Sequence, residues 1–214
     1  MSRPVLYTYH RNSAGERVRI ALNLKGMAYD YVSAVALGER YLEVNPQGLM
    51  PALKVDGRVI AQSGAILEWI EETWPTPPLL PADPVTRAQA RGFGQHIAAE
   101  MHALTIVRVR RYLAETMGAD AVAIEAWQDH WMRLGFTALE AALADRPAPR
   151  PFAFGETPGW AELHLIPQLR NARRFGCDLS SYPSLLAIEA RCIDLPAFRA
   201  ALPENQPDYP GGEA

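Results

Sequence analysis

The chain has 214 residues, of which 49% are hydrophobic and 21% are charged, and its formal net charge is −3. This length and composition suffice for one large domain or two small ones and exclude global disorder. The slightly acidic balance excludes a generally basic nucleic-acid binder, and no run of about 18 apolar residues predicts a membrane span. The N-terminus has no continuous apolar stretch of the kind found in secretory signals, so we expect a cytoplasmic protein with no nucleic-acid or membrane partner.

The chain has only two cysteines, Cys177 and Cys192. They form no CxxC pair and belong to no cluster of metal-ligating residues. We therefore expect neither a disulfide scaffold nor a metal site.

The first 75 residues alternate between strand-like and helix-like periodicity. A strand, a helix and a second strand in this order indicate a parallel pair with a right-handed crossover, and Asp56-Gly57 is a hairpin signal. The predicted elements are strand 4–9, helix 14–26, strand 29–34, a short helix 38–44, strands 52–55 and 58–61, and a helix from Ser63. This order predicts an α/β domain of thioredoxin-like type, with a mixed four-stranded sheet, over residues 1–76.

Residues 75–84 contain five prolines, so we expect a stiff linker at 77–84 and a domain boundary. Beyond it the apolar residues repeat at helical spacing, which predicts an all-α domain over 85–214. The predicted helices are 85–117, 119–144, 160–175, 183–192 and a short one at 196–201, with a proline-rich loop at 146–158 and a tail at 203–214 that wraps the surface or frays.

Three turns of the first domain are candidate anion sites, because the first N–H groups of a helix lack intrahelical partners and the helix dipole is positive there. Asn12 and Ser13 begin the first helix and could hold an ionised sulfur. A cis Met50-Pro51 bond could expose the Met50 backbone. Gln62 and Ser63 begin a later helix and could bind a carboxylate. The alternatives are plain helix caps at the two helix starts and an ordinary trans proline.

The helical domain offers weaker candidates. His102 and Arg108 lie on the first long helix, and Arg174 lies near the end of a later one. A lone histidine on a helix is more often structural or solvated than catalytic, and arginine clusters usually form a solvated face. Arginine becomes informative if the substrate carries carboxylates, because its planar fork binds them bidentately.

Taken together, these residues resemble the zeta class of glutathione transferases, which includes maleylacetoacetate and maleylpyruvate isomerases. The likeness covers roughly residues 5–208. The matching segments are Leu6-Tyr7 through Arg11, Arg17–Leu22, Leu24–Gly26, Asn45-Pro46, Pro51–Leu53, Gln62-Ser63, Pro75–Pro77, Leu79–Pro81, Pro167-Gln168, Asn171-Ala172, Arg174-Phe175, Asp178-Leu179 and Tyr182-Pro183.

The resemblance implies a homodimer that uses glutathione as its cofactor. Met50, beside a cis Pro51, would pair its backbone with the cysteinyl unit of glutathione, and Gln62 and Ser63 would hold the γ-glutamyl end. His102 and Arg108 match positions that face the active site. Arg11, Arg108 and Arg174 match positions that meet the substrate's carboxylates in the isomerases.

The sequence departs from the class in the turn before the first helix, where the class has Arg-Ser-Ser-Cys. Here the turn reads Arg11-Asn12-Ser13-Ala14, so the serine that usually donates to the sulfur is Asn12. The asparagine N–H or the adjacent Ser13 hydroxyl could donate instead. The usual helix-capping threonine and aspartate of the second domain are Gly159 and Glu162.

The implied reaction is the cis–trans isomerisation of a small unsaturated diketo diacid of the maleylacetoacetate or maleylpyruvate type. Reversible addition of the glutathione thiolate turns the double bond briefly into a single bond, which can rotate. Two alternatives remain open: a general glutathione transferase or dehalogenase that consumes the thiol, and a glutathione-binding protein without turnover. The arginines favour the isomerase, whereas Asn12 and Ala14 favour the non-catalytic protein.

Overall fold

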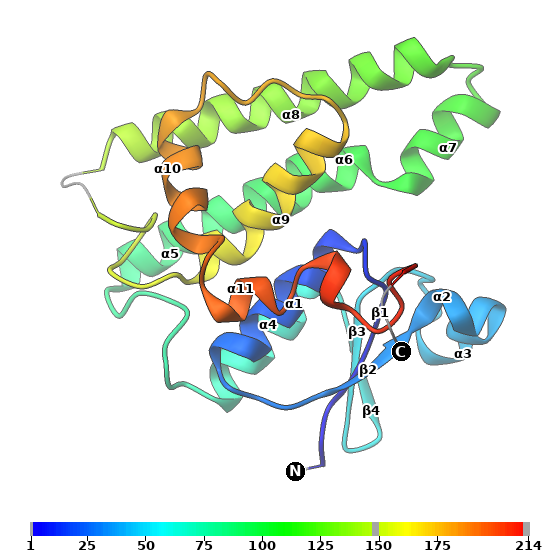
Figure 1. Ribbon diagram of the computed structural model, residues 1–214, viewed down its shortest axis with the longest axis horizontal. Helices are drawn as coiled ribbons and strands as arrows, with labels where there is room; N and C mark the ends of the chain where they lie inside the picture. Colours follow the sequence, from blue (N-terminus) through cyan, green and yellow to red (C-terminus); the bar gives the residue numbers. More distant parts are fainter. Residues whose placement is uncertain (1, 147–149, 212–214) are drawn as a thin grey trace. The chain divides into compact units, whose positions relative to one another are not determined.

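The computed structural model describes residues 2–146 and 150–211, which fold as two compact units (Figure 1). The first unit comprises residues 2–79 and 193–211, and the second comprises the described residues of 80–192. The division after residue 79 falls within the proline-rich segment 75–84. Each unit is described by itself.

The first unit contains a four-stranded sheet in the order β2-β1-β3-β4. Its strands are β1 (Val5–Thr8), β2 (Asp30–Ser33), β3 (Ala52–Val55) and β4 (Arg58–Ala61). β1 pairs parallel with β2 and antiparallel with β3, and β3 and β4 form the hairpin across Asp56-Gly57. This sheet confirms the predicted mixed thioredoxin-like architecture.

Helices cover both faces of this sheet because side chains alternate along each strand. The helices are α1 (Ser13–Leu24), α2 (Ala34–Leu37), η1 (Gly38–Arg40), α3 (Tyr41–Val44) and α4 (Ser63–Thr73). On one face, Ala52 and Tyr7 pack with Ala34 and Tyr41 of α2 and α3. The helices α1 and α4 contact each other, and α4 also contacts β3 and β4.

The C-terminal segment belongs to the first unit, although the sequence placed residues 193–214 in the all-α domain. Its helices α11 (Pro196–Arg199) and η3 (Pro203–Asn205) follow α10 (Pro183–Cys192), and α11 packs on α1. The Arg19 guanidinium donates to the Ala201 carbonyl at 2.9 Å, and the Asn23 amide donates to the Ala197 carbonyl at 2.9 Å. These long-range bonds, which no local pattern reveals, correct the predicted domain assignment of the segment.

Asp208 extends this attachment to the edge of the sheet. Its carboxylate accepts hydrogen bonds from the Tyr31 hydroxyl at 2.7 Å, the Ser33 hydroxyl at 2.7 Å and the His10 backbone N–H at 3.1 Å. Burial and the bond to Asp208 raise the pKa of Tyr31, so its phenol stays protonated and continues to donate. Through residue 208 the tail therefore lies on the surface of the first unit. Of the two predicted alternatives, wrapping the surface and fraying, this part of the tail takes the first.

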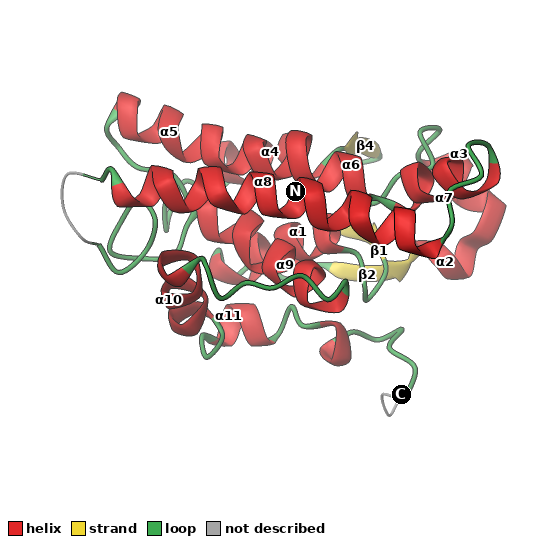
Figure 2. Ribbon diagram, turned by 90° about the horizontal axis from the view of Figure 1, so that it is seen from above, coloured by secondary structure: helices red, strands yellow, loops and turns green. Residues whose placement is uncertain are grey.

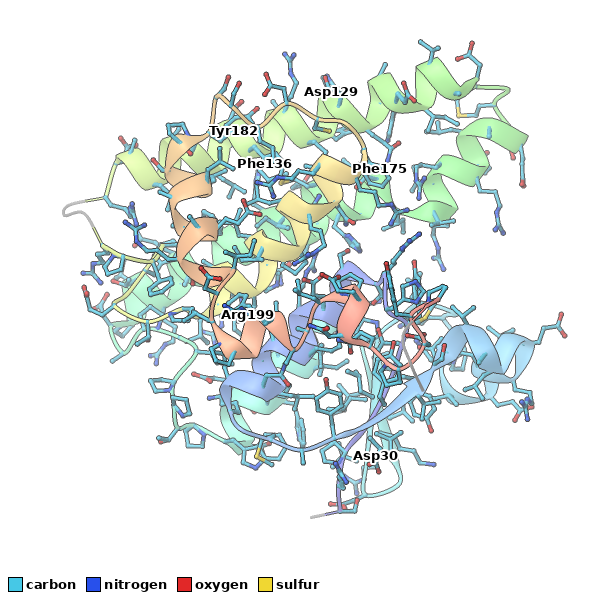
Figure 3. All side chains as sticks on the ribbon, in the orientation of Figure 1. Asp30, Asp129, Phe136, Phe175, Tyr182 and Arg199 are labelled. Carbon is cyan, nitrogen blue, oxygen red and sulfur yellow. The ribbon has the colours of Figure 1, made fainter. Side chains whose placement is uncertain are left out.

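The second unit is all-helical (Figure 2). Its helices are α5 (Pro84–Gln95), the π-helical η2 (His96–His102), α6 (Ala103–Thr105), α7 (Val107–Glu115), α8 (Ala121–Ala144), α9 (Trp160–Arg174) and α10 (Pro183–Cys192). Its core combines apolar side chains from α5, η2, α8 and α9, such as Phe93, Ile97, Phe136 and Leu169. In Figure 3 the rings of Phe136 and Tyr182 lie close together, with centroids 5.5 Å apart.

The predicted single helix over 85–117 is wrong, because the helix breaks at Ile106. This residue has an extended backbone, with φ −68° and ψ 161°. The break leaves carbonyl groups of the preceding turn without helical donors, and side chains supply them: the Thr105 hydroxyl donates to the Met101 carbonyl at 2.9 Å, and the Trp127 indole donates to the Leu104 carbonyl at 2.8 Å. The break thus depends on a tryptophan from α8.

The start of α9 is capped despite its glycine. Glu162 accepts hydrogen bonds from the backbone N–H groups of Gly159 and Ala153, both at 2.8 Å. Burial raises the pKa of this carboxyl, and the hydrogen bonds oppose the rise. Of the predicted loop at 146–158, residues 147–149 lie outside the described residues.

Candidate functional site

The three candidate turns of the first unit, at Asn12, Met50 and Gln62, follow or precede strands at one end of the sheet, which is called the sheet edge below. In the register, Tyr7 of β1 pairs with Ala52 of β3, and Ala52 pairs with Ala61 of β4. The end of β1, the start of β3 and the end of β4 therefore lie at the same edge. The segments 9–13, 49–51 and 62–65 continue from these strand ends, which is why residues far apart in sequence can serve one ligand.

Asn12 is the N-cap of α1. Its side-chain oxygen accepts a hydrogen bond from the Gly15 backbone N–H, and the Thr8 hydroxyl donates to the same oxygen at 3.4 Å. The capping alternative considered from the sequence is therefore realised. The oxygen can only accept, so the Asn12 amide nitrogen carries the donors that this side chain can offer to a ligand. Ser13 follows as the buried first residue of the helix.

The Met50-Pro51 peptide bond is cis. The carbonyl of the preceding Leu49 accepts hydrogen bonds from the Tyr41 hydroxyl and the Asn45 amide, both at 2.7 Å. Within the described residues, the Met50 N–H and C=O make no hydrogen bond. A half-buried backbone with this unused donor and acceptor fits an extended peptide ligand that pairs with it in the manner of a strand.

No side chain of the described residues caps the start of α4. Gln62, at the N-cap position, has a positive φ of 73°, and its amide donates to the Gln47 side chain at 2.8 Å instead of capping the helix. A helix start of this kind attracts a carboxylate through its free N–H groups and its dipole. Ser63, the first residue of α4, adds a hydroxyl at this place. Because α1 is capped and α4 is not, the α4 start is the better carboxylate site.

Arg17 lies beneath this helix start. It is 1% exposed, and its Nη1 donates to the Ser63 Oγ at 3.3 Å. Its Nε and Nη2 have no hydrogen-bond acceptor in the described part of the chain. Burial lowers the pKa of Arg17 to about 10, and the neighbouring Glu16 carboxylate opposes this shift. The guanidinium therefore remains cationic at neutral pH.

Arg17 lies in one of the segments that carry the family resemblance and is not among the predicted site residues. No local signal singles out Arg17, because α1 is buried on every side from Ser13 to Leu22. Only the packing around the helix shows that this charge is buried, and burial of a charge without full compensation is costly.

The second unit carries the remaining candidates. His102 is the half-buried last residue of the π-helical segment, and Arg108 is exposed in the first turn of α7. Arg174 ends α9, and its guanidinium carbon lies 5.2 Å from the centroid of the Phe175 ring, labelled in Figure 3. The Arg110 guanidinium lies 5.1 Å from the same ring. The Phe175 ring therefore contacts two guanidinium groups, whereas Arg11, which is exposed, belongs to the first unit.

The chain's own thiols are unsuited to nucleophilic chemistry. Cys177 and Cys192 are free and buried, and burial raises the pKa of both. Among the described residues there is no group of three or more His, Cys, Asp or Glu side chains that could hold a metal ion. Within the same residues, no helix is long and apolar enough to cross a membrane.

Comparison with known proteins gives consistent likenesses. Residues 13–73 match the family model of the glutathione S-transferase N-terminal domain. Over 209 residues the chain is 46% identical to a maleylpyruvate isomerase from Ralstonia sp., with 95% of this chain and 98% of the relative covered.

Solved structures agree over nearly the whole length. The holo structure of a maleylpyruvate isomerase, described as a bacterial glutathione S-transferase of the zeta class, superposes with a TM-score of 0.93 at 43% identity, covering 96% of this chain and 100% of that one. A maleylacetoacetate isomerase from Methylobacterium extorquens AM1, with bound malonate and glutathione, has a TM-score of 0.90 at 36% identity and covers 96% and 99%.

Proposed function

Since this chain belongs to the zeta class of glutathione S-transferases, we propose that it is a glutathione-dependent cis–trans isomerase of a small unsaturated diketo diacid, of the maleylpyruvate or maleylacetoacetate type. The observation that carries the proposal is the sheet edge where an uncapped α4 start, the Met50 backbone and the Asn12 turn lie together. Binding of both glutathione and malonate, a diacid, by a relative supports the same chemistry.

The residues at this edge fit glutathione. We assign the γ-glutamyl carboxylate to Ser63, Gln62 and the N–H groups at the start of α4. We assign the cysteinyl backbone to Met50 beside cis Pro51, which offers one donor and one acceptor. His102 is a further cofactor-binding residue in this assignment.

Bound glutathione supplies a thiolate that adds reversibly to the conjugated carbon of the substrate and leaves again. Asn12 and Ser13 hold the sulfur in its ionised form. A free thiol has a pKa of about 8.5, so lowering it by about two units requires roughly 2.7 kcal/mol of differential stabilisation. One or two hydrogen bonds to the charged sulfur, at roughly 1.5–3 kcal/mol each, are sufficient.

We assign the carboxylates of the substrate to Arg11, Arg108 and Arg174. Their guanidinium groups bind carboxylates bidentately and so favour a diacid over a neutral substrate. These three arginines favour the isomerase over a general transferase or dehalogenase, because those enzymes need the sulfur site but fewer arginines. The proposal also includes a homodimer and a cytoplasmic location, where thiols are kept reduced.

The arginine assignment is tested by assaying Arg108→Ala and Arg174→Ala with a cis diacid and with a neutral electrophile. We expect each substitution to lower kcat/KM for the diacid by roughly ten- to a hundredfold, equivalent to one lost charge-assisted hydrogen bond, and to change the rate with the neutral electrophile little. Arg111→Ala is the matched control, because Arg111 lies exposed on α7 beside Glu115, 3.9 Å away.

The outcomes separate the rival functions. Equal small effects on both substrates would favour the general transferase. Absence of diacid turnover in the wild type, with glutathione binding intact, would favour the non-catalytic protein. Absence of glutathione binding would overturn the proposed function as a whole.

A further inference from the structure

The first helix contains two buried arginines with opposite hydrogen bonding. Arg19 is 0% exposed, and all three of its guanidinium nitrogens donate to backbone carbonyls, at Tyr9, His10 and Ala201. Arg17 is 1% exposed, yet within the residues that the structure describes only its Nη1 has an acceptor, the Ser63 hydroxyl oxygen at 3.3 Å. Arg19 is therefore a structural cross-link, whereas the bonds of Arg17 do not explain why a charge is buried there.

Burying a guanidinium with two nitrogens unsatisfied lowers the stability of the fold. Replacing such a group by an apolar side chain of similar length is often neutral or stabilising. A residue that costs stability in the folded protein points to a role outside folding. The hydrogen bond of Arg17 to Ser63, the first residue of α4, indicates where this role lies.

We propose that Arg17 is a positioning residue for the γ-glutamyl carboxylate of glutathione, acting through Ser63 at the uncapped start of α4. This inference rests on the proposed function, because it assumes glutathione as the ligand. It goes beyond that function because Arg17, a buried residue that does not touch the ligand, would help to bind the γ-glutamyl carboxylate.

The physical reason lies in the hydroxyl group between them. Arginine has donors and no acceptor, so the Ser63 oxygen must accept from Arg17 and its own O–H must point elsewhere. The hydroxyl hydrogen is thereby free to donate to a carboxylate at the helix start. The guanidinium is planar and rigid, so its other N–H groups remain close to the same place, and its charge adds to the positive end of the α4 dipole.

The test compares glutathione with 4-aminobutyryl-cysteinylglycine, which is glutathione without the γ-glutamyl α-carboxylate, by calorimetry on the full chain. We expect the wild type to bind glutathione roughly ten- to a hundredfold more tightly than the analogue, as for a charge-assisted hydrogen bond. In Arg17→Met this ratio should fall to within about threefold, while the melting temperature stays equal or rises.

Arg19→Met is the matched control, since it removes a buried arginine two residues away in the same helix. It should lower the melting temperature and leave the binding ratio as in the wild type. Ser63→Ala should lower the ratio like Arg17→Met, and the double variant should lower it no further, because both residues act on one carboxylate.

An unchanged ratio in Arg17→Met, with glutathione bound, would overturn this inference and leave the proposed function standing. Failure of the wild type to bind glutathione would overturn both. If Arg17→Met does not fold, the inference is tested in the wild type by the nitrogen NMR signal of the Arg17 guanidinium. It should shift on addition of glutathione and much less with the analogue, and equal shifts would overturn the inference.

Discussion

Asn12 caps α1, and the proposed function gives the same side chain a second task. Its oxygen caps α1 through the Gly15 N–H, and its amide nitrogen is the group we assign to the sulfur of glutathione. The two tasks use opposite ends of one planar amide, so the cap itself orients the donor. A serine in this position has one oxygen for both tasks, which gives a physical reason why asparagine can replace it.

The separate roles of the Asn12 oxygen and nitrogen predict different effects for two substitutions of this residue. Asn12→Asp keeps an oxygen for the cap but replaces the donor by a negative charge, so stability should be retained while the pKa of the bound glutathione thiol rises and kcat falls. Asn12→Ala removes both groups and should lower the free energy of unfolding by about 1 kcal/mol.

Chemical unfolding measures the stability, and the ultraviolet absorbance of the bound thiolate as a function of pH measures the thiol pKa. A thiol pKa that is the same in Asn12→Asp and in the wild type would remove Asn12 from the sulfur site. Ser13 and the helix N–H groups would then carry the ionisation alone.

At the scale of elements, α5 and α9 approach closely because Gly94 has no side chain. A Cβ at this position would lie 2.7 Å from the Trp160 Nε1 and 2.9 Å from the His164 Nδ1. The His164 ring also makes a 2.8 Å hydrogen bond to the Trp160 backbone carbonyl, so the His164 side chain does not move without loss. Glycine is a poor helix former, and here the close approach explains its presence.

Two alanine substitutions in α5 should therefore have opposite signs. Gly94→Ala should lower the free energy of unfolding by about 1–3 kcal/mol through overpacking. Gly92→Ala should raise it by roughly 0.5–1 kcal/mol, because a Cβ there meets no atom within 4 Å and alanine favours the helix. Urea unfolding of both variants gives the comparison, and shifts in the same direction would contradict the close approach of α5 and α9.

The segment that follows α10 shows how one element stabilises another that is distant in sequence. Arg19 and Asn23 of α1 donate to carbonyls of Ala201 and Ala197, and Asp208 binds residues at the ends of β1 and β2. The turn that carries Arg11 and Asn12 lies directly after His10, whose N–H donates to Asp208. The C-terminal segment therefore contributes to holding the turn that we assign to the sulfur.

At the scale of the whole molecule, the resemblance to the zeta class predicts a homodimer with two-fold symmetry. Light scattering at micromolar concentration should give a mass of about twice 23.7 kDa. A mass of 23.7 kDa under these conditions would contradict the dimer. The same measurement on Arg17→Met would show whether a change in glutathione binding is independent of assembly.

The sequence by itself determined the elements whose signals are local. Strands β3 and β4 begin and end at the predicted residues because Asp56-Gly57 marks the turn between them, and α4 begins at Ser63 as expected. The choice of the three turns as anion sites also followed from local rules, because helix starts and X-Pro bonds are visible in the sequence. The sheet register then placed them at one edge.

The tertiary structure alone decided the features that depend on partners distant in sequence. At the helix break at Ile106, Trp127 binds the Leu104 carbonyl, and Arg19 binds the C-terminal segment at Ala201. Arg17 is buried where its guanidinium reaches Ser63, 46 residues further along the chain. The isomer of Met50-Pro51 belongs to the same group, because cis and trans differ by only about 0.5–1 kcal/mol in an isolated chain. Local preferences of this size are smaller than the free energy of a few tertiary contacts, so the packed structure makes these choices.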